Sequence, residues 1–546
     1  MKKIEKYMPW IGTALLGIGA WIFWTFIHPE LLSFQEELQM FLFDKEYFLE
    51  RAALPSGVAR YVAEFLTQFY SYVNIGALVV ALLFVALQQC VWHLAKKHCK
   101  DKAWYWVSFL PVLMLWFYMG DPNVKLTFVV SILFALVAML CYPADAGKKT
   151  AGIYLFIATP LVYWCAGPCV LIFALYVLLY NVYATHVSFS QLPPYGEGQG
   201  ERSQKSALMG VGNLLYAIAL ILASASFVPQ PVYRLFYGIS YSLQIVEFHA
   251  LQFVVMALFA CVPFIISCLP HVKSERTANG FYGGLFGCVF SLGMLIVPLG
   301  FDAKECEVLK YDMLARGNKW DKIIEMAQAK NPDFPTSVAT LNLALGMKGR
   351  LNESGMSFFQ NGWGGAFPHF NRNCIVSICL SEISYQLGLV NSAQRFAFEA
   401  NEAISDNNKS ARLVRRLVET NIANGQYEVA RKYIHMLQKT LFYKRWADET
   451  LALLGNEDAI NNHPYYGYMR KIHLDEDFLF SDAEIDRIMG QLVMKSKENN
   501  LAIQYLLFLP QLEGNQQKYM MYLEYVKERL NGADETPADS VAADSI

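Results

Sequence analysis

The chain has 546 residues, of which 55% are hydrophobic, 14% aromatic and only 17% charged, and its formal net charge is −2. Soluble domains carry about 25% charged residues, so a chain this long and this poor in charge is not an ordinary cytosolic enzyme. The near-neutral charge, with no basic tract, also removes the electrostatic basis for binding nucleic acid.

The charged residues are unevenly distributed along the chain. Residues 1–300 contain 18 of the 45 Lys and Arg and 15 of the 47 Asp and Glu, although they make up more than half of the length. We therefore expect an all-α protein in which a polytopic helical membrane domain covers residues 1–300. The remainder has the charge density of a soluble domain.

Nine mostly apolar segments in the first part approach the roughly 20 residues that a helix needs to cross the hydrocarbon core. They cover residues 8–27, 73–92, 103–119, 124–142, 151–165, 169–185, 207–226, 250–269 and 281–299. Gly167-Pro168 leaves almost no loop between the fifth and the sixth. An odd number of crossings predicts that the two ends of this domain face opposite sides of the membrane.

The basic residues in short loops predict the orientation, because Lys and Arg are enriched in cytoplasmic loops. Loops on the N-terminal side carry thirteen Lys and Arg, and those on the other side carry only five, Lys45, Arg51, Arg60, Lys125 and Arg234. This asymmetry predicts a cytoplasmic N-terminus. We expect a multi-pass protein of a bacterial inner membrane, with the residues after about 300 outside the cytoplasm, in the periplasm.

The long outer loop, residues 28–72, has the pattern of two interfacial amphipathic helices. Apolar residues recur at helical spacing on each side of a Pro-Ser-Gly turn at residues 55–57, namely Phe34, Leu38, Phe41, Leu42 and Phe48, then Val58, Val62, Phe65 and Phe69.

The same loop concentrates acidic side chains: Glu36, Glu37, Asp44, Glu46, Glu50 and Glu64. Glu36 and Glu37 follow the first apolar segment, where a carboxylate would face the membrane surface. Taken singly, each acid fits the solvated face of an amphipathic helix. A second acid, Asp121, occurs in the short outer loop Gly120-Asp121-Pro122-Asn123.

Residues 301–531 show helical periodicity interrupted by short Gly- or Asn-containing breaks. Three breaks can be superposed, at Gly349, Gly388 and Gly425, and each is followed by a small residue five positions later and a further core residue. This pattern resembles tetratricopeptide repeats, in which Gly closes the turn between two antiparallel helices. Residues 532–546 are rich in Ala, Asp and Ser, and we expect a disordered tail there.

The cysteines show no Cys-x-x-Cys pair and no Cys/His spacing typical of zinc. From spacing alone we expect neither a structural metal nor a disulfide framework.

The order of the parts resembles membrane-embedded glycosyltransferases of the GT-C fold. These share a cytoplasmic N-terminus, a long first outer loop with interfacial helices and an early acid, and a second outer loop with another acid. A membrane domain followed by an external tetratricopeptide array is similar to one branch, the transmembrane tetratricopeptide O-mannosyltransferases. The chain departs from the pattern in lacking an Asp-x-Asp or Asp-Asp pair in either loop.

The resemblance implies transfer of a sugar from a polyprenyl-phosphate donor to a protein or glycan acceptor held by the repeat domain. Such a reaction needs a carboxylate base for the acceptor hydroxyl and a fixed cation for the departing phosphate. The candidates are Glu36, Glu37 and Asp121 for the base and substrate positioning, and Arg234 and Arg60 for the phosphate. The resemblance assigns no metal ligand and leaves open whether a divalent cation takes part.

Two alternative functions belong to classes of protein other than transferases. A non-enzymatic membrane-anchored scaffold for assembling periplasmic complexes would use the repeats alone, although one crossing would suffice as its anchor. A transporter is disfavoured because the apolar segments contain no intramembrane charge pair and no clear inverted repeat.

Overall fold

The computed structural model describes residues 2–97, 102–143, 147–190, 197–238, 250–269, 275–477 and 485–531. Within these ranges the chain is helical and contains no strand, which confirms the predicted all-α class. The expected disordered tail, residues 532–546, lies outside the described residues.

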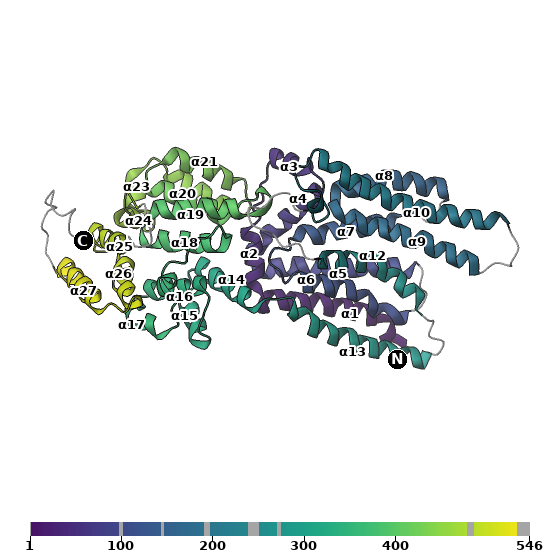
Figure 1. Ribbon diagram of the computed structural model, residues 1–546, viewed down its shortest axis with the longest axis horizontal. Coiled ribbons are helices and arrows are strands. Elements are labelled where there is room, and N and C mark those ends of the chain that lie inside the picture. The colour runs from purple at the N-terminus through teal and green to yellow at the C-terminus, as the bar shows by residue number, and fades with distance from the viewer. Residues whose placement is uncertain are drawn as a thin grey trace. The chain divides into compact units, whose positions relative to one another are not determined.

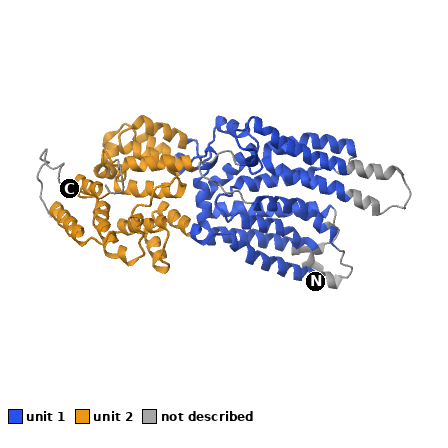
Figure 2. Ribbon diagram, viewed as in Figure 1, with its two compact units in different colours: residues 1–306, 404–411, 438–444 blue, residues 307–403, 412–437, 445–546 orange. Residues whose placement is uncertain are grey.

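Contacts divide the chain into two units (Figure 2). Unit 1 comprises residues 1–306 together with 404–411 and 438–444; unit 2 comprises 307–403, 412–437 and 445–546. The sequence placed a boundary at residue 300. It gave no sign that two short segments from the second half belong to unit 1, because that membership depends on contacts with distant parts of the chain.

Helices occupy all nine apolar segments of unit 1 in its described residues (Figure 1). In chain order they are α1 (Lys2–Ile22) with the π-helical turn η1 (Phe23–Ile27), α5 (Val73–Lys96), η3 (Lys102–Phe109) with α6 (Leu110–Tyr118), α7 (Leu126–Cys141), α8 (Lys148–Ala166), α9 (Val170–Ser190), α10 (Glu197–Ala223), α12 (Leu251–Cys268) and α13 (Glu275–Leu299). A 3₁₀ turn, η4 (Gly167–Cys169), separates α8 from α9.

Five helical stretches in the described residues are long and apolar enough to cross a membrane: Pro9–Ile27, Val73–Lys96, Lys148–Tyr183, Ala207–Ser226 and Gly280–Leu299. Their outward faces carry large apolar side chains, since Trp10, Phe156, Leu208 and Leu299 are each at least 69% exposed. Apolar surface of this extent is typical of contact with lipid or a partner. The number of crossings stays a prediction.

The helices of unit 1 pack both on their neighbours in the chain and on helices from distant segments. Helix α1 packs against α5, α5 against α7, and α9 against both α10 and α12. Small residues permit close approach, as membrane helices require: a Cβ on Gly210 of α10 would lie 2.9 Å from the Leu178 Cα of α9.

The region 28–72 differs from the two helices expected there. It forms α2 (Pro29–Glu37), α3 (Lys45–Ala52), α4 (Gly57–Thr67) and the 3₁₀ turn η2 (Gln68–Ser71), so the first expected helix is interrupted between α2 and α3. The backbone N–H of Met40 donates to the Lys409 carbonyl (2.9 Å) and that of Phe43 to the Lys439 carbonyl (2.8 Å). Bonds to segments 404–411 and 438–444 therefore replace helical ones.

Unit 2 consists of helices, most of them joined by short turns. After α14 (Ala303–Arg316), which starts within unit 1, they are α15 (Trp320–Ala329), α16 (Pro335–Met347), α17 (Leu351–Ser354), α18 (Cys374–Leu387), α19 (Val390–Ala403), α20 (Ala411–Ala423), α21 (Tyr427–Gln438), α22 (Lys444–Leu453), α23 (Glu457–Asn462), α24 (Tyr466–Ile472), α25 (Ile485–Lys495), α26 (Asn500–Leu512) and α27 (Gln516–Asn531). Its main core includes Ile323, Leu345 and Phe508, none of them solvent-exposed. The connection from α17 to α18 is longer and carries the 3₁₀ turns η6 (Gly355–Ser357) and η7 (Gly362–Gly365).

Two of the three superposed breaks join a pair of helices of ordinary length. Gly388 (φ 94°) lies between α18 and α19, and Gly425 (φ 69°) between α20 and α21. The small residues that follow, Ala393 and Ala430, are fully buried. The break at Gly349 differs, because α17 spans only Leu351–Ser354.

Replacing the turn glycines by alanine tests the conformation of these turns. A left-handed residue with a side chain costs roughly 1–2 kcal/mol, and we expect Gly425→Ala to destabilise by about that amount, because its Cβ would enter open space. Gly388→Ala should cost clearly more, since its Cβ would lie 2.9 Å from the Ile472 carbonyl oxygen. Thermal unfolding of the purified full chain measures both; equal midpoints for the two variants would contradict the packing at Gly388.

Candidate functional site

Helix α2 is short, polar and enclosed by protein. Pro29 starts it one residue after η1, and Glu36 and Glu37 are only 6% and 1% exposed. The sequence placed these two carboxylates at the membrane surface or, taken singly, on the solvated face of an amphipathic helix, and their burial contradicts the solvated face. Burying a polar group costs free energy unless the group has a hydrogen-bond or ionic partner. The buried carboxylates of α2 therefore require polar partners in the surrounding protein.

Helix α2 contacts the turn that carries Asp121. The Gln35 side-chain amide donates to the Val124 carbonyl (2.8 Å), which joins α2 to the end of that turn. The Asp121 carboxylate shapes the turn, since its Oδ1 accepts from the backbone N–H of Asn123 (2.8 Å) and from its side-chain amide (2.9 Å). Helix α2, which carries Glu36 and Glu37, and the turn with Asp121 are therefore neighbours.

A further acid, which the sequence did not single out, belongs to the same region. Gly120 packs so closely on Gly300 that a Cβ would lie 2.1 Å from the Gly300 carbonyl oxygen, which brings the turn beside the start of α14. There Glu305 is half-buried; burial, and then the negative charges of Asp121 and Asp302, raise the pKa of Glu305 to about 7.

His28, Glu30 and Cys306 form the set of potential metal ligands found in the described residues. One donor atom from each lies within 4.8 Å of the other two. His28 precedes α2, Glu30 is in its first turn, and Cys306 is in the first turn of α14.

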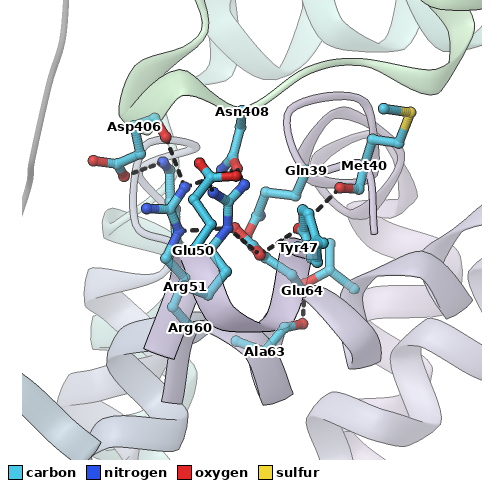
Figure 3. A network of polar contacts seen from close by, with 12 residues as sticks. Gln39, Met40, Tyr47, Glu50, Arg51, Arg60, Ala63, Glu64, Asp406 and Asn408 are labelled. Carbon is cyan, nitrogen blue, oxygen red and sulfur yellow. Dashed lines mark hydrogen bonds and ion pairs between the residues drawn. The ribbon is translucent and has the colours of Figure 1, made fainter. Parts of the chain in front are cut away.

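Arg60, predicted to bind phosphate, lies instead in a buried network around Glu64 (Figure 3). Glu64 is fully buried. Its carboxylate accepts from Arg60 Nε (2.9 Å), Arg51 Nε (3.1 Å) and the Tyr47 hydroxyl (2.5 Å). Burial alone would raise the pKa of Glu64, but the two guanidinium groups hold it below its usual range.

The network also binds segment 404–411 of the same unit. Arg51 Nη2 and Arg60 Nη2 donate to the Asn408 side-chain oxygen (3.0 and 2.9 Å), and Arg60 Nη2 donates to the Asp406 carbonyl (2.7 Å). Arg60 thus donates three hydrogen bonds to groups of the protein itself. It is therefore a weaker candidate ligand for a substrate phosphate than the sequence pattern indicated.

Arg234, the other predicted phosphate ligand, lies on the short helix α11 (Val232–Leu235) and is half-buried. Tyr237, whose backbone N–H donates to the Arg234 carbonyl (2.9 Å), interacts electrostatically with Tyr118, and so does Asp121.

Comparison with known proteins identifies a family. The family described as "Family of unknown function (DUF6057)" matches residues 6–538. The chain belongs to the DUF6057 family. No curated protein matches it, and no solved structure does.

Sequence reasoning missed several contacts of this DUF6057 protein for different reasons. Arg60 and Glu64 are four residues apart, so their pairing on one helix face was readable from spacing. Asn408 and Cys306 were not, because they lie hundreds of residues from their partners and neither belongs to a recognisable motif.

Neutralising Glu64 tests the buried network. Glu64→Gln leaves Arg51 and Arg60 buried without their anionic partner, and removing one member of a buried ion pair costs about 3–5 kcal/mol. Glu50→Gln is the matched control: Glu50 also pairs with Arg51 (2.9 Å) but is 66% exposed, and such pairs contribute about 1 kcal/mol or less. Glu64→Gln should lower the midpoint of thermal unfolding more than Glu50→Gln does. A similar decrease in both variants would contradict a special role for Glu64.

The same carboxylate predicts a dependence of stability on pH. Because the pKa of Glu64 is lower in the folded chain than in the unfolded chain, its contribution is complete above the unfolded value, about 4.3, and is lost as the pH falls through the folded value. The unfolding midpoint of the wild type should therefore approach that of Glu64→Gln as the pH is lowered from 7 toward 3. A constant difference between them would exclude this linkage.

Proposed function

We propose that the chain is an integral-membrane transferase of the GT-C type, with nine crossings and a cytoplasmic N-terminus. It transfers a sugar from a polyprenyl-phosphate donor at the outer face of a bacterial inner membrane. The tetratricopeptide-like helices of unit 2 bind the protein or glycan acceptor.

The observation that carries the proposal is the placement of α2. Its carboxylates, Glu36 and Glu37, are buried immediately after the first apolar helix, and Gln35 beside them bonds to the turn that carries Asp121. A reaction at the membrane surface needs acidic groups held there by protein, because water otherwise weakens their interactions and competes with the acceptor.

The chemistry requires one proton transfer and one displacement. The acceptor hydroxyl gives its proton to a carboxylate, its oxygen forms a bond to the anomeric carbon, and the bond from that carbon to the phosphate oxygen breaks with its electron pair on the phosphate. Glu36 or Glu37 is the base, and Asp121 positions the acceptor. Arg234 stabilises the departing phosphate, since Arg60 is already engaged by Glu64 and Asn408.

Conservative neutralisation of the three acids tests this assignment. We expect Glu36→Gln, Glu37→Gln or Asp121→Asn to lower transfer from a panel of polyprenyl-phosphate sugars by roughly 10²–10⁴-fold for the residue that acts as base. The reaction is measured in proteoliposomes, with size-exclusion profiles to establish folding. Glu46→Gln is the control, because Glu46 lies in the same region but is exposed. Full activity in all three variants would falsify the assignment.

A scaffold function is favoured by a different observation, the helix pairs around Gly388 and Gly425 with Ala393 and Ala430 buried between them. Helical repeats of this kind present extended binding surfaces. A scaffold requires no base. A chain carrying all three neutralised acids would then still support growth in a deletion strain, whereas the transferase would not.

A further inference from the structure

A histidine, a glutamate and a cysteine from two distant segments meet within unit 1. His28 and Glu30 flank the start of α2, and a hydrogen bond of 2.8 Å joins His28 Nδ1 and Glu30 Oε1. Cys306 comes from α14, and its Sγ lies within 4.8 Å of the donor atoms of the other two. His28 is 20% exposed in its side chain, whereas Glu30 and Cys306 are buried. The three side chains thus form one small, largely enclosed cluster.

One oxygen of the Glu30 carboxylate is buried without a hydrogen bond. Glu30 is only 2% exposed, and its Oε2 has no hydrogen-bond partner among the described residues. A buried carboxylate oxygen left without a partner costs free energy that a coordinated cation would recover.

The cluster is held in place by its surroundings. The His28 ring stacks on Phe301, with centroids 4.5 Å apart and an interplanar angle of 16°. The backbone N–H of Cys306 donates to the Asp302 carbonyl (2.9 Å), which fixes the first turn of α14. Side chains whose orientation is set by packing and backbone bonds require little rearrangement to bind a metal.

We infer that His28, Glu30 and Cys306 form a zinc site. A thiolate, an imidazole and a carboxylate are the ligand types of tetrahedral zinc, whereas Mg²⁺ and Ca²⁺ take oxygen ligands. Three protein ligands leave a fourth position for water or an anionic oxygen of a bound molecule, the arrangement found in catalytic rather than structural zinc sites. The site stands whether or not the chain is a transferase.

Metal content of the full chain purified in detergent, without chelators, tests the site. After dialysis, mass spectrometry of the metals should find about one zinc ion per chain. Cys306→Ser, His28→Ala and Glu30→Gln should lose it. Cys288→Ser and His93→Ala are the matched controls, because both residues are exposed and lie outside the cluster. Zinc retained equally by Cys306→Ser and the wild type would overturn the inference.

A second measurement uses only the folded wild type, in case a variant fails to fold. Zinc added to metal-free protein should slow alkylation of Cys306 at least tenfold, as followed on its peptide by mass spectrometry, and should leave alkylation of Cys288 unchanged. Cobalt in place of zinc should give a near-ultraviolet thiolate charge-transfer band. Unchanged alkylation of Cys306 together with no such band would reject the zinc site.

Discussion

The carboxylate of Glu64, held between two arginines, is the interaction on which the arrangement of the first unit most depends. It joins α3 to α4, and the same arginines reach Asn408. Segment 404–411 then makes two further contacts: Lys125 pairs with Asp406 (2.6 Å), and Met40 donates to the Lys409 carbonyl. One short segment from the second half of the chain therefore fixes α4, the break after α2 and the turn that follows Asp121.

The burial of so many polar groups in this region has an energetic consequence. Isolated buried charges are strongly unfavourable, and an ion pair offsets its desolvation only when its hydrogen bonds are nearly complete. The Glu64 network meets this condition with three donors on one carboxylate. Helix α2 is different, because one oxygen of Glu30 has no hydrogen-bond partner within the part of the chain that the structure describes.

The two proposals made for this region use different groups. The transferase uses the C-terminal end of α2 and the Asp121 turn, and the zinc site uses the N-terminal end of α2 and the start of α14. Acidic side chains of the Asp121 turn and of the start of α14 lie close together, since Asp121 and Asp302 both interact electrostatically with Glu305.

The sequence by itself determined the helical class, the apolar segments and the turns at Gly388 and Gly425, because periodicity and left-handed backbone are properties of a few consecutive residues. It also drew attention to Glu36, Glu37 and Asp121. Only the tertiary structure decided that α2 is buried, that a helix expected after residue 34 breaks, and that Cys306 lies beside His28. Those outcomes depend on contacts between segments far apart in the chain, and no local pattern encodes which distant backbone or side chain will meet another.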